Sequence, residues 1–227
     1  MRKRILAGSL ILAAALYSFG CRPGASGLPL LMTSDFESGQ ADGWAPNDPA
    51  HWRVVADGGS MIYELTASGE PGPVRAPASV SVWTGHDASS FEFTGRLRCD
   101  ADAASPVRDM CVIFHYRDPA HFYYVHFAGS SDAVHNIIGI VDGADRVKIN
   151  AEPAGASTFR LADRAWHAVK VTCDARTGDI RADLDDMTSP VLTARDNRIG
   201  HGLVGVGSFD DTGAFDDLTF LGIARKD

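Results

Sequence analysis

The stretch Met110–Asp142, MCVIFHYRDPAHFYYVHFAGSSDAVHNIIGIVD, decides the fold of this chain. It contains three runs in which apolar and polar residues alternate. The runs are separated by Asp-Pro-Ala and by a Gly-Ser-Ser-Asp cluster, both typical of turns. The pattern predicts three successive antiparallel β-strands, and it interleaves His, Tyr, Arg and Asn with apolar side chains.

Alternation also predicts which side chains share a face, because successive residues of a strand point to opposite sides of the sheet. In the first strand, Val112, Phe114 and Tyr116 are expected in the core. In the second strand, the same argument places Tyr123 and Val125 there. The residues left on the outer face of this hairpin are Cys111, Ile113, His115, Arg117, Phe122, Tyr124 and His126.

This outer face is the predicted functional site. A hairpin register with His115 opposite Tyr124 gathers imidazole, guanidinium and phenol groups on neighbouring strands. The next strand begins with His135 and Asn136, one of which should share the face. Aromatic rings stack on sugar rings, and imidazole, guanidinium and amide groups bond sugar hydroxyls. The predicted carbohydrate-binding residues are His115, Arg117, Tyr124, His126, His135 and Asn136.

Two other interpretations of these side chains stay open. Tyr and His often lie half-buried in a sandwich face with one hydrogen bond satisfied, which needs no ligand. Metal binding by the histidines is less favoured, because the His-x-His spacing is absent and no carboxylate joins the predicted set.

Outside the central stretch, strand patterns recur from Trp52 to the end of the chain. HWRVVADGGSMIYELTA and WHAVKVTCDARTGDIRADLDD are predicted hairpins, closed at Asp57-Gly58-Gly59 and at Thr177-Gly178. No segment shows a sustained helical period. Many short strands, each with one polar face, predict an all-β fold of two packed antiparallel sheets over residues 32–227, with the first and last strands side by side.

Composition excludes one class of partner. The chain has 227 residues with 21 Lys and Arg against 29 Asp and Glu, giving a formal net charge of −8. Nucleic-acid binding relies on clustered positive charge to neutralise phosphates. The sequence therefore predicts no nucleic-acid partner.

The first residues are predicted to be a targeting segment. Arg2-Lys3-Arg4 precedes a short apolar run that ends near Cys21, as in a secretory signal. Residues 1–21 are expected to direct export, and Cys21 could be lipidated as in a bacterial lipoprotein. The Gly- and Pro-rich residues 22–31 would form a tether. The predicted location is therefore the cell envelope or the exterior, with a lipid on Cys21 as the only contact with a membrane.

Three further cysteines remain, Cys99, Cys111 and Cys173. A bond between Cys99 and Cys111 would suit an oxidising compartment. Strand parity disfavours it, because a direct cross-strand pair would turn one set of apolar residues outward. Three buried free thiols are the preferred interpretation.

The segments DFESGQADGW, HWRVV and RAPASVSVWTGHDASSFEFTGRLR resemble the opening strands of concanavalin A-like, laminin-G-like jelly rolls. HYRDPAHFYYVHF, WHAVKVTCDARTGDI and GLVGVGSFDDTGAFDDL are similar to the middle and closing strands of that superfamily. The resemblance implies two curved antiparallel sheets with a concave face where sugars bind. Lectins, carbohydrate-binding modules, glycoside hydrolases and polysaccharide lyases share this scaffold, so the resemblance does not decide the activity.

The resemblance also allows catalytic patterns to be checked. The Glu-x-Asp-x-x-Glu pattern of the glucanases with this fold does not occur in the sequence. The lyases use Tyr and His as acid and base, with Arg and an amide to neutralise a uronic acid carboxylate. If the protein is an enzyme, the candidate catalytic residues are Tyr124, His126, Arg117 and His115.

A structural calcium ion is a further expectation of the resemblance. Carbohydrate-binding jelly rolls often hold one where the terminal strands meet, and oxygen ligands suit this ion. The predicted ligands are Asp35, Glu37, Asp216 and Asp217. The alternative is that these carboxylates cap turns and keep a sheet edge soluble.

The sequence therefore favours an exported β-sandwich that binds a polysaccharide or glycan on its concave sheet. A polysaccharide lyase or glycoside hydrolase acting through the same face is one alternative. A non-catalytic envelope module that meets another protein is a second, and an exposed apolar patch would favour it.

Overall fold

The computed structural model describes residues 27–150 and 159–225. The predicted signal, the lipidation site Cys21 and the first half of the predicted tether lie outside these ranges. Within them the chain is all-β, with one short 3-10 turn, η1, over Pro49–His51, and no helix long and apolar enough to cross a membrane. The strands are β1 (Leu30–Ser34), β2 (Trp44–Pro46), β3 (Trp52–Asp57), β4 (Ser60–Leu65), β5 (Ser79–Cys99), β6 (Asp109–Asp118), β7 (His121–Ala128), β8 (Ile137–Asp142), β9 (Val147–Lys148), β10 (His167–Asp174), β11 (Asp179–Leu184), β12 (Leu192–Arg195), β13 (Gly202–Ser208) and β14 (Gly213–Ala224).

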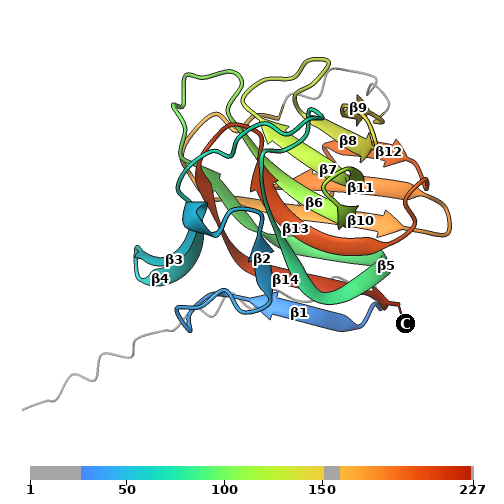
Figure 1. The fold of residues 1–227 in the computed structure, drawn as a ribbon, viewed down its shortest axis with the longest axis horizontal. Helices are drawn as coiled ribbons and strands as arrows, with labels where there is room; N and C mark the ends of the chain where they lie inside the picture. The colour runs from blue at the N-terminus through green and yellow to red at the C-terminus, as the bar shows by residue number, and fades with distance from the viewer. Residues whose placement is uncertain (1–26, 151–158, 226–227) are drawn as a thin grey trace, which may run out of the picture.

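The long strand β5 joins the two layers of the sandwich (Figure 1). Its first part, Ser79–Trp83, pairs with β2 and β13, and β13 continues through β6, β7 and β8 to β9. Its second part, residues 88–99, pairs with β14 on one side. On the other side, residues 91–97 pair with β10, and the sheet continues from β10 to β11 and then to β12. All these pairings are antiparallel. We call the layer that contains β6, β7 and β8 the central sheet, and the layer that contains β10, β11 and β14 the outer sheet.

The predicted core lies between these two sheets. Phe91, Phe93 and Leu97 of β5 alternate with polar residues in the sequence, face inward and are at most 1% exposed. Val112 and Phe114 of the central sheet pack in the same cluster. Burial of this many large apolar side chains is the main favourable term in folding.

Two predictions about strand pairing are confirmed. β1 pairs with β14, with Ser34 opposite Leu218, so the first and last strands lie side by side (Figure 1). β10 and β11 form the hairpin predicted around Thr177-Gly178, with Asp174 opposite Asp179. The three cysteines of the described part of the chain, Cys99, Cys111 and Cys173, are buried and free, as preferred above.

The predicted register of the β6–β7 hairpin is wrong. Tyr124 lies opposite Ile113, not opposite His115. A bulge shifts the register between Phe114 and Asp118, and His115 has a φ of +48° within it. A bulge adds a residue to one strand, so the side chains that follow change face. Tyr116 consequently leaves the core and contacts Phe122 on the other side of the sheet, with ring centroids 5.5 Å apart.

Candidate functional site

The face of the central sheet predicted to be open is covered. Ile113, Phe122 and Tyr124 are at most 1% exposed and belong to a second hydrophobic cluster. Val74 and Ala76, from the segment between β4 and β5, pack against this cluster from outside the sheet, and Phe209 is a buried member of it. The cover explains why two successive strands have almost no exposed position on either face.

Polar contacts hold the covering segment in place. The Arg75 guanidinium donates to the Asp210 carboxylate at 2.6 and 3.3 Å. The backbone N–H of Arg75 donates to Oδ1 of Asp145 at 2.7 Å, and the N–H of Arg146 donates to the Arg75 carbonyl at 3.0 Å. The Arg75 and Arg146 guanidinium groups lie 5.1 and 4.3 Å from the centre of the Phe209 ring. Such cation–π contacts add to the attachment of the cover.

His115 is not on this face at all. The bulge turns it to the core side, where it contacts the rings of Phe91, Phe114 and Tyr123. Its two ring nitrogens each lie 2.7 Å from a backbone carbonyl, of Ile199 and of Ser89. Burial lowers the pKa of His115, although the two carbonyls act in the opposite direction. The prediction that His115 shares a face with Tyr124 and His126 is therefore wrong.

Arg117, His135 and Asn136 lie in three different surroundings. Arg117 is exposed and contacts Nε2 of His201, whose Nδ1 lies 2.7 Å from the Asp87 carboxylate. His135 is paired with Asp132 at 2.7 Å. Asn136 is 3% exposed, and its amide joins three segments through Ala128, Ser131 and Phe159. The six predicted residues therefore do not converge on one open surface.

Tyr124 and His126 do share a face, but they are buried with Asp109 and Cys111. Burial raises the pKa of Tyr124, and Arg146 acts in the opposite direction. A tyrosine under a cover, with a raised pKa, is poorly suited to exchange protons with a polysaccharide near neutral pH. This placement argues against the lyase reaction considered for Tyr124 and His126.

Asp109, Cys111 and His126 form a compact polar group that sequence reasoning missed. Their ligand atoms all lie within 4.8 Å of one another, and among the described residues this is the one group of three that could share a metal ion. Burial alone would raise the pKa of Asp109, but the His126 imidazole, the Phe209 N–H and Ser208 more than offset it, so the pKa is lowered. Asp109 and Cys111 alternate on β6, which the sequence shows, but His126 lies opposite Cys111 only in the observed register and not in the predicted one.

The four acidic residues predicted to bind calcium make other contacts, and Asp35 accepts from the Glu37 N–H at 3.2 Å. Arg96 pairs with the buried Asp216 and, at 3.0 Å, with Asp217. Glu37 accepts from the Ser60 hydroxyl at 2.7 Å and from the Met61 N–H at 2.9 Å. Because a guanidinium group already supplies the positive charge beside Asp216, this arrangement fits an ion-pair network better than a calcium site.

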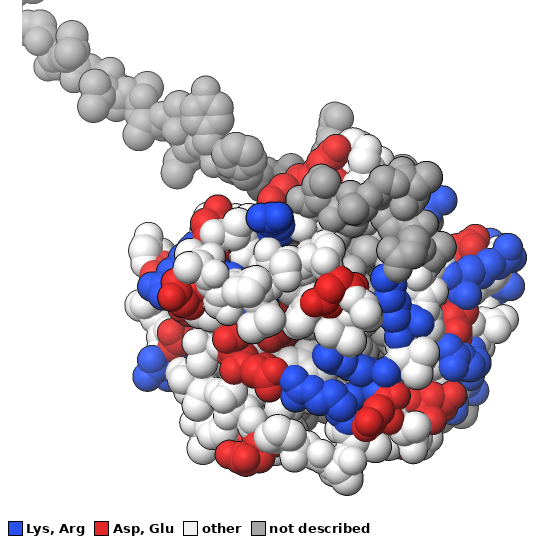
Figure 2. All heavy atoms as spheres, turned by 90° about the horizontal axis from the view of Figure 1, so that it is seen from above, with Lys and Arg blue, Asp and Glu red and all other residues white. Residues whose placement is uncertain are grey.

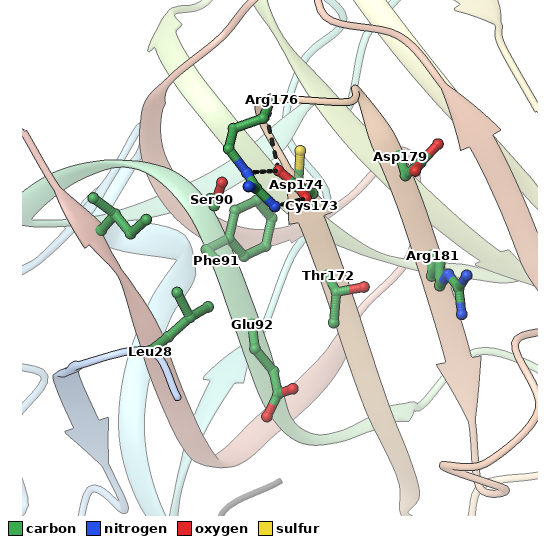
Figure 3. A pocket seen from close by; sticks show the side chains of 11 residues that line it. Leu28, Ser90, Phe91, Glu92, Thr172, Cys173, Asp174, Arg176, Asp179 and Arg181 are labelled. Atoms are coloured by element: carbon green, nitrogen blue, oxygen red, sulfur yellow. Dashed lines mark hydrogen bonds and ion pairs between the residues drawn. The ribbon is translucent and has the colours of Figure 1, made fainter. Parts of the chain in front are cut away.

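An open hollow of about 430 Å³ lies on the outer sheet (Figure 3). Glu92 of β5 lies opposite Thr172 of β10, and Thr172 lies opposite Arg181 of β11, so the three side chains form one row across neighbouring strands. No described residue forms an ion pair or hydrogen bond with the side chain of Glu92 or Arg181. The hollow is lined by Leu28, Ser90, Phe91, Glu92, Thr172, Cys173, Asp174, Arg176, Asp179, Arg181 and Ile223.

Charges around the hollow are mixed. Arg176 is already paired with Asp174 at 2.9 Å, as Figure 3 shows. Asp179 accepts from the Thr177 hydroxyl at 2.8 Å. Ile223 is 50% exposed and adds an apolar wall. Basic and acidic side chains are also interleaved over the face seen in Figure 2. The hollow therefore offers hydrogen-bonding groups without a strong field of one sign.

Comparisons with known proteins establish the fold. No protein-family model and no curated protein sequence matches the chain. Among solved structures, a carbohydrate-binding module, CBM66 of Bacillus subtilis, matches with a TM-score of 0.53 and 14% identity, covering 79% of this chain and 96% of the module.

Two further solved structures match over similar lengths. The winged bean acidic lectin complexed with methyl-α-D-galactose has a TM-score of 0.53 and 12% identity, covering 86% of this chain and 98% of the lectin. The GH16 protein from a mixed linkage glucan locus of Bacteroides ovatus, in complex with a product, has a TM-score of 0.54 and 12% identity. The match covers 84% of this chain and 100% of the GH16 chain. The chain thus has the concanavalin A-like jelly-roll fold that its sequence indicated.

Proposed function

We propose that this protein is an exported, non-catalytic carbohydrate-binding module that takes a glycan in the hollow of the outer sheet. The row formed by Glu92, Thr172 and Arg181 carries the proposal. It places a carboxylate, a hydroxyl and a guanidinium group side by side, and the charged two of the three make no ion pair with any residue that the structure describes. Lectins, a carbohydrate-binding module and a glucan-bound GH16 protein among the fold neighbours support a sugar as the ligand.

The chemistry of the row suits sugar hydroxyls. A carboxylate accepts hydrogen bonds, a guanidinium group donates them, and a threonine hydroxyl does both. Neighbouring strands lie about 4.8 Å apart, so Glu92 and Arg181 anchor positions about 10 Å apart along the sheet. That span exceeds one pyranose ring, which favours an oligosaccharide or polysaccharide over a monosaccharide.

The surroundings indicate a neutral glycan bound weakly. The lining has three carboxylates, Glu92, Asp174 and Asp179, against two guanidinium groups, Arg176 and Arg181, so its charge balance disfavours a uronic acid. Phe91, the aromatic residue of the lining, is 1% exposed and offers little surface for stacking on a sugar ring. We therefore expect a dissociation constant of about 1 mM per site, equivalent to about −4 kcal/mol.

A multivalent glycan array tests the proposal, because clustering raises weak affinity into a measurable range. The wild-type chain should bind a neutral polysaccharide, and Thr172→Ala combined with Arg181→Ala should reduce that binding at least tenfold. Arg53→Ala is the matched control, since Arg53 is exposed on β3 outside the hollow. Arg117→Ala tests the exposed member of the face predicted from sequence. If Arg117→Ala abolished glycan binding while the Thr172→Ala and Arg181→Ala double variant bound fully, the hollow would be rejected as the glycan site.

A further inference from the structure

We propose that Asp109, Cys111 and His126 form a binding site for a divalent transition-metal ion of the zinc type. The three side chains come from facing positions of β6 and β7, with Cys111 directly opposite His126. All three are at most 1% exposed. They supply one carboxylate oxygen, one sulfur and one imidazole nitrogen within 4.8 Å of one another.

The measured separations match a tetrahedral ion. Oδ2 of Asp109 lies 3.2 Å from Nε2 of His126 and 3.6 Å from Sγ of Cys111. With bonds of about 2.0 Å to oxygen and nitrogen and about 2.3 Å to sulfur, ligands of tetrahedral zinc lie about 3.3 Å apart for the oxygen and nitrogen pair and about 3.5 Å apart for the oxygen and sulfur pair. Asp109 therefore already lies at ligand spacing from both partners, and Sγ of Cys111 lies within 4.8 Å of Nε2 of His126.

His126 is oriented as a metal ligand would be. Its Nδ1 lies 2.9 Å from the carbonyl oxygen of Val134, which can only accept a hydrogen bond, so Nδ1 carries a proton. This leaves Nε2 directed at Asp109, and it makes no aligned hydrogen bond with any residue in the described ranges. Metal-binding histidines usually donate their second ring N–H to a carbonyl or carboxylate in this way.

Asp109 is fixed by its own partners. The Ser208 hydroxyl donates to Oδ1 at 3.0 Å, and the Phe209 N–H donates to Oδ2 at 2.9 Å. These contacts hold the carboxylate in one orientation, as the outer shell of a metal site does. A thiolate, an imidazole and one carboxylate select zinc, cobalt or a related ion over calcium, which prefers six to eight oxygen ligands.

Binding of the metal ion releases one proton and leaves the site without net charge. The Cys111 thiol loses its proton to solvent as the metal–sulfur bond forms, and no electron is transferred. The resulting thiolate and the Asp109 carboxylate together offset the two positive charges of the ion. Two cations lie near the group: Arg75 on the covering segment is paired with Asp210, and Arg146 acts on Cys111.

Cobalt(II) is the probe for this site, because a cobalt–thiolate bond gives a charge-transfer band in the near ultraviolet. The purified full-length chain is unfolded with a chelator, refolded with Co²⁺ and dialysed, since the buried site is best filled as the chain folds. We expect one equivalent of bound cobalt, the band, and displacement of cobalt by one equivalent of Zn²⁺. Absence of the band in the wild-type chain overturns the proposal.

Matched thiol variants assign the ligand. Cys111→Ala should abolish the band and weaken zinc binding by at least about 100-fold, whereas Cys99→Ala removes an equally buried thiol outside the group and should change neither. His126→Gln should weaken binding similarly while keeping the thiol. Circular dichroism confirms that each variant is folded, and Cys111→Ser replaces Cys111→Ala if the latter is not. A band that persists without Cys111 overturns the proposal.

Discussion

Nε2 of His126 lies 3.2 Å from Oδ2 of Asp109, and the two side chains are 2% and 1% exposed. A carboxylate at this depth costs several kcal/mol of desolvation unless it is paired and hydrogen-bonded. Here the imidazole, the Ser208 hydroxyl and the Phe209 N–H surround it. The polar group therefore fixes Ser208 and Phe209 in place, and the Phe209 ring is the one against which Arg75 of the covering segment packs.

Removing the carboxylate should be costly. Asp109→Ala leaves the Ser208 hydroxyl and the Phe209 N–H buried without their acceptor. We expect the free energy of unfolding to fall by about 3 kcal/mol, measured by urea denaturation in the presence of a chelator. Asp118→Ala is the control, because it breaks an exposed pair with His121 and should cost less than about 1 kcal/mol. Equal losses in the two variants would contradict the assigned role of Asp109.

His115 should give stability a particular dependence on pH. Its pKa is lowered in the folded protein, so as pH falls below the unfolded value of about 6.5 the unfolded chain takes up a proton that the folded chain resists. The contribution is present above pH ~6.5 and is lost as pH falls toward the folded pKa. His115→Asn, which tolerates a positive φ, should lose less stability than the wild type between pH 7.5 and 5. Melting temperatures that decline in parallel would contradict this account.

Gly139 tests the close packing under Tyr124. A Cβ at this position would lie 2.4 Å from Cζ and the hydroxyl oxygen of Tyr124, closer than real contacts allow. Gly139→Ala should therefore destabilise the fold by about 1–3 kcal/mol, because Tyr124 is enclosed and cannot move aside. Gly200→Ala is the matched control, since nothing lies within 4 Å of its added Cβ. Comparable unfolding midpoints for the two variants would show that Tyr124 is free to move.

Local pattern predicted much of the fold. Alternation placed Val112, Phe114, Tyr123 and Val125 in the core correctly, because successive side chains of a strand can only point to one or the other face of the sheet. The turn at Thr177-Gly178 was also visible in the sequence. These features depend on residues close together along the chain.

The site was harder to predict, because its outcome depends on residues far apart in sequence. The cover over Tyr124 comes from Val74 and Ala76, about 50 residues earlier in the chain. The sequence of β6 and β7 does not indicate that this segment packs on them. The bulge at His115 is a local irregularity between Phe114 and Asp118, and it turns Tyr116 to the opposite face of the sheet. Glu92 and Arg181 are on one row because β10 lies between them, a pairing that only the three-dimensional order of strands reveals.

The most direct test of the proposed function is to locate the bound glycan by hydrogen exchange. Amide exchange is measured by mass spectrometry with and without a saturating oligosaccharide chosen from the array. We expect protection in peptides that contain Glu92, Thr172 and Arg181, with β7 unchanged. Protection confined to β6 and β7 around Tyr124, or none in the outer sheet, would contradict the account.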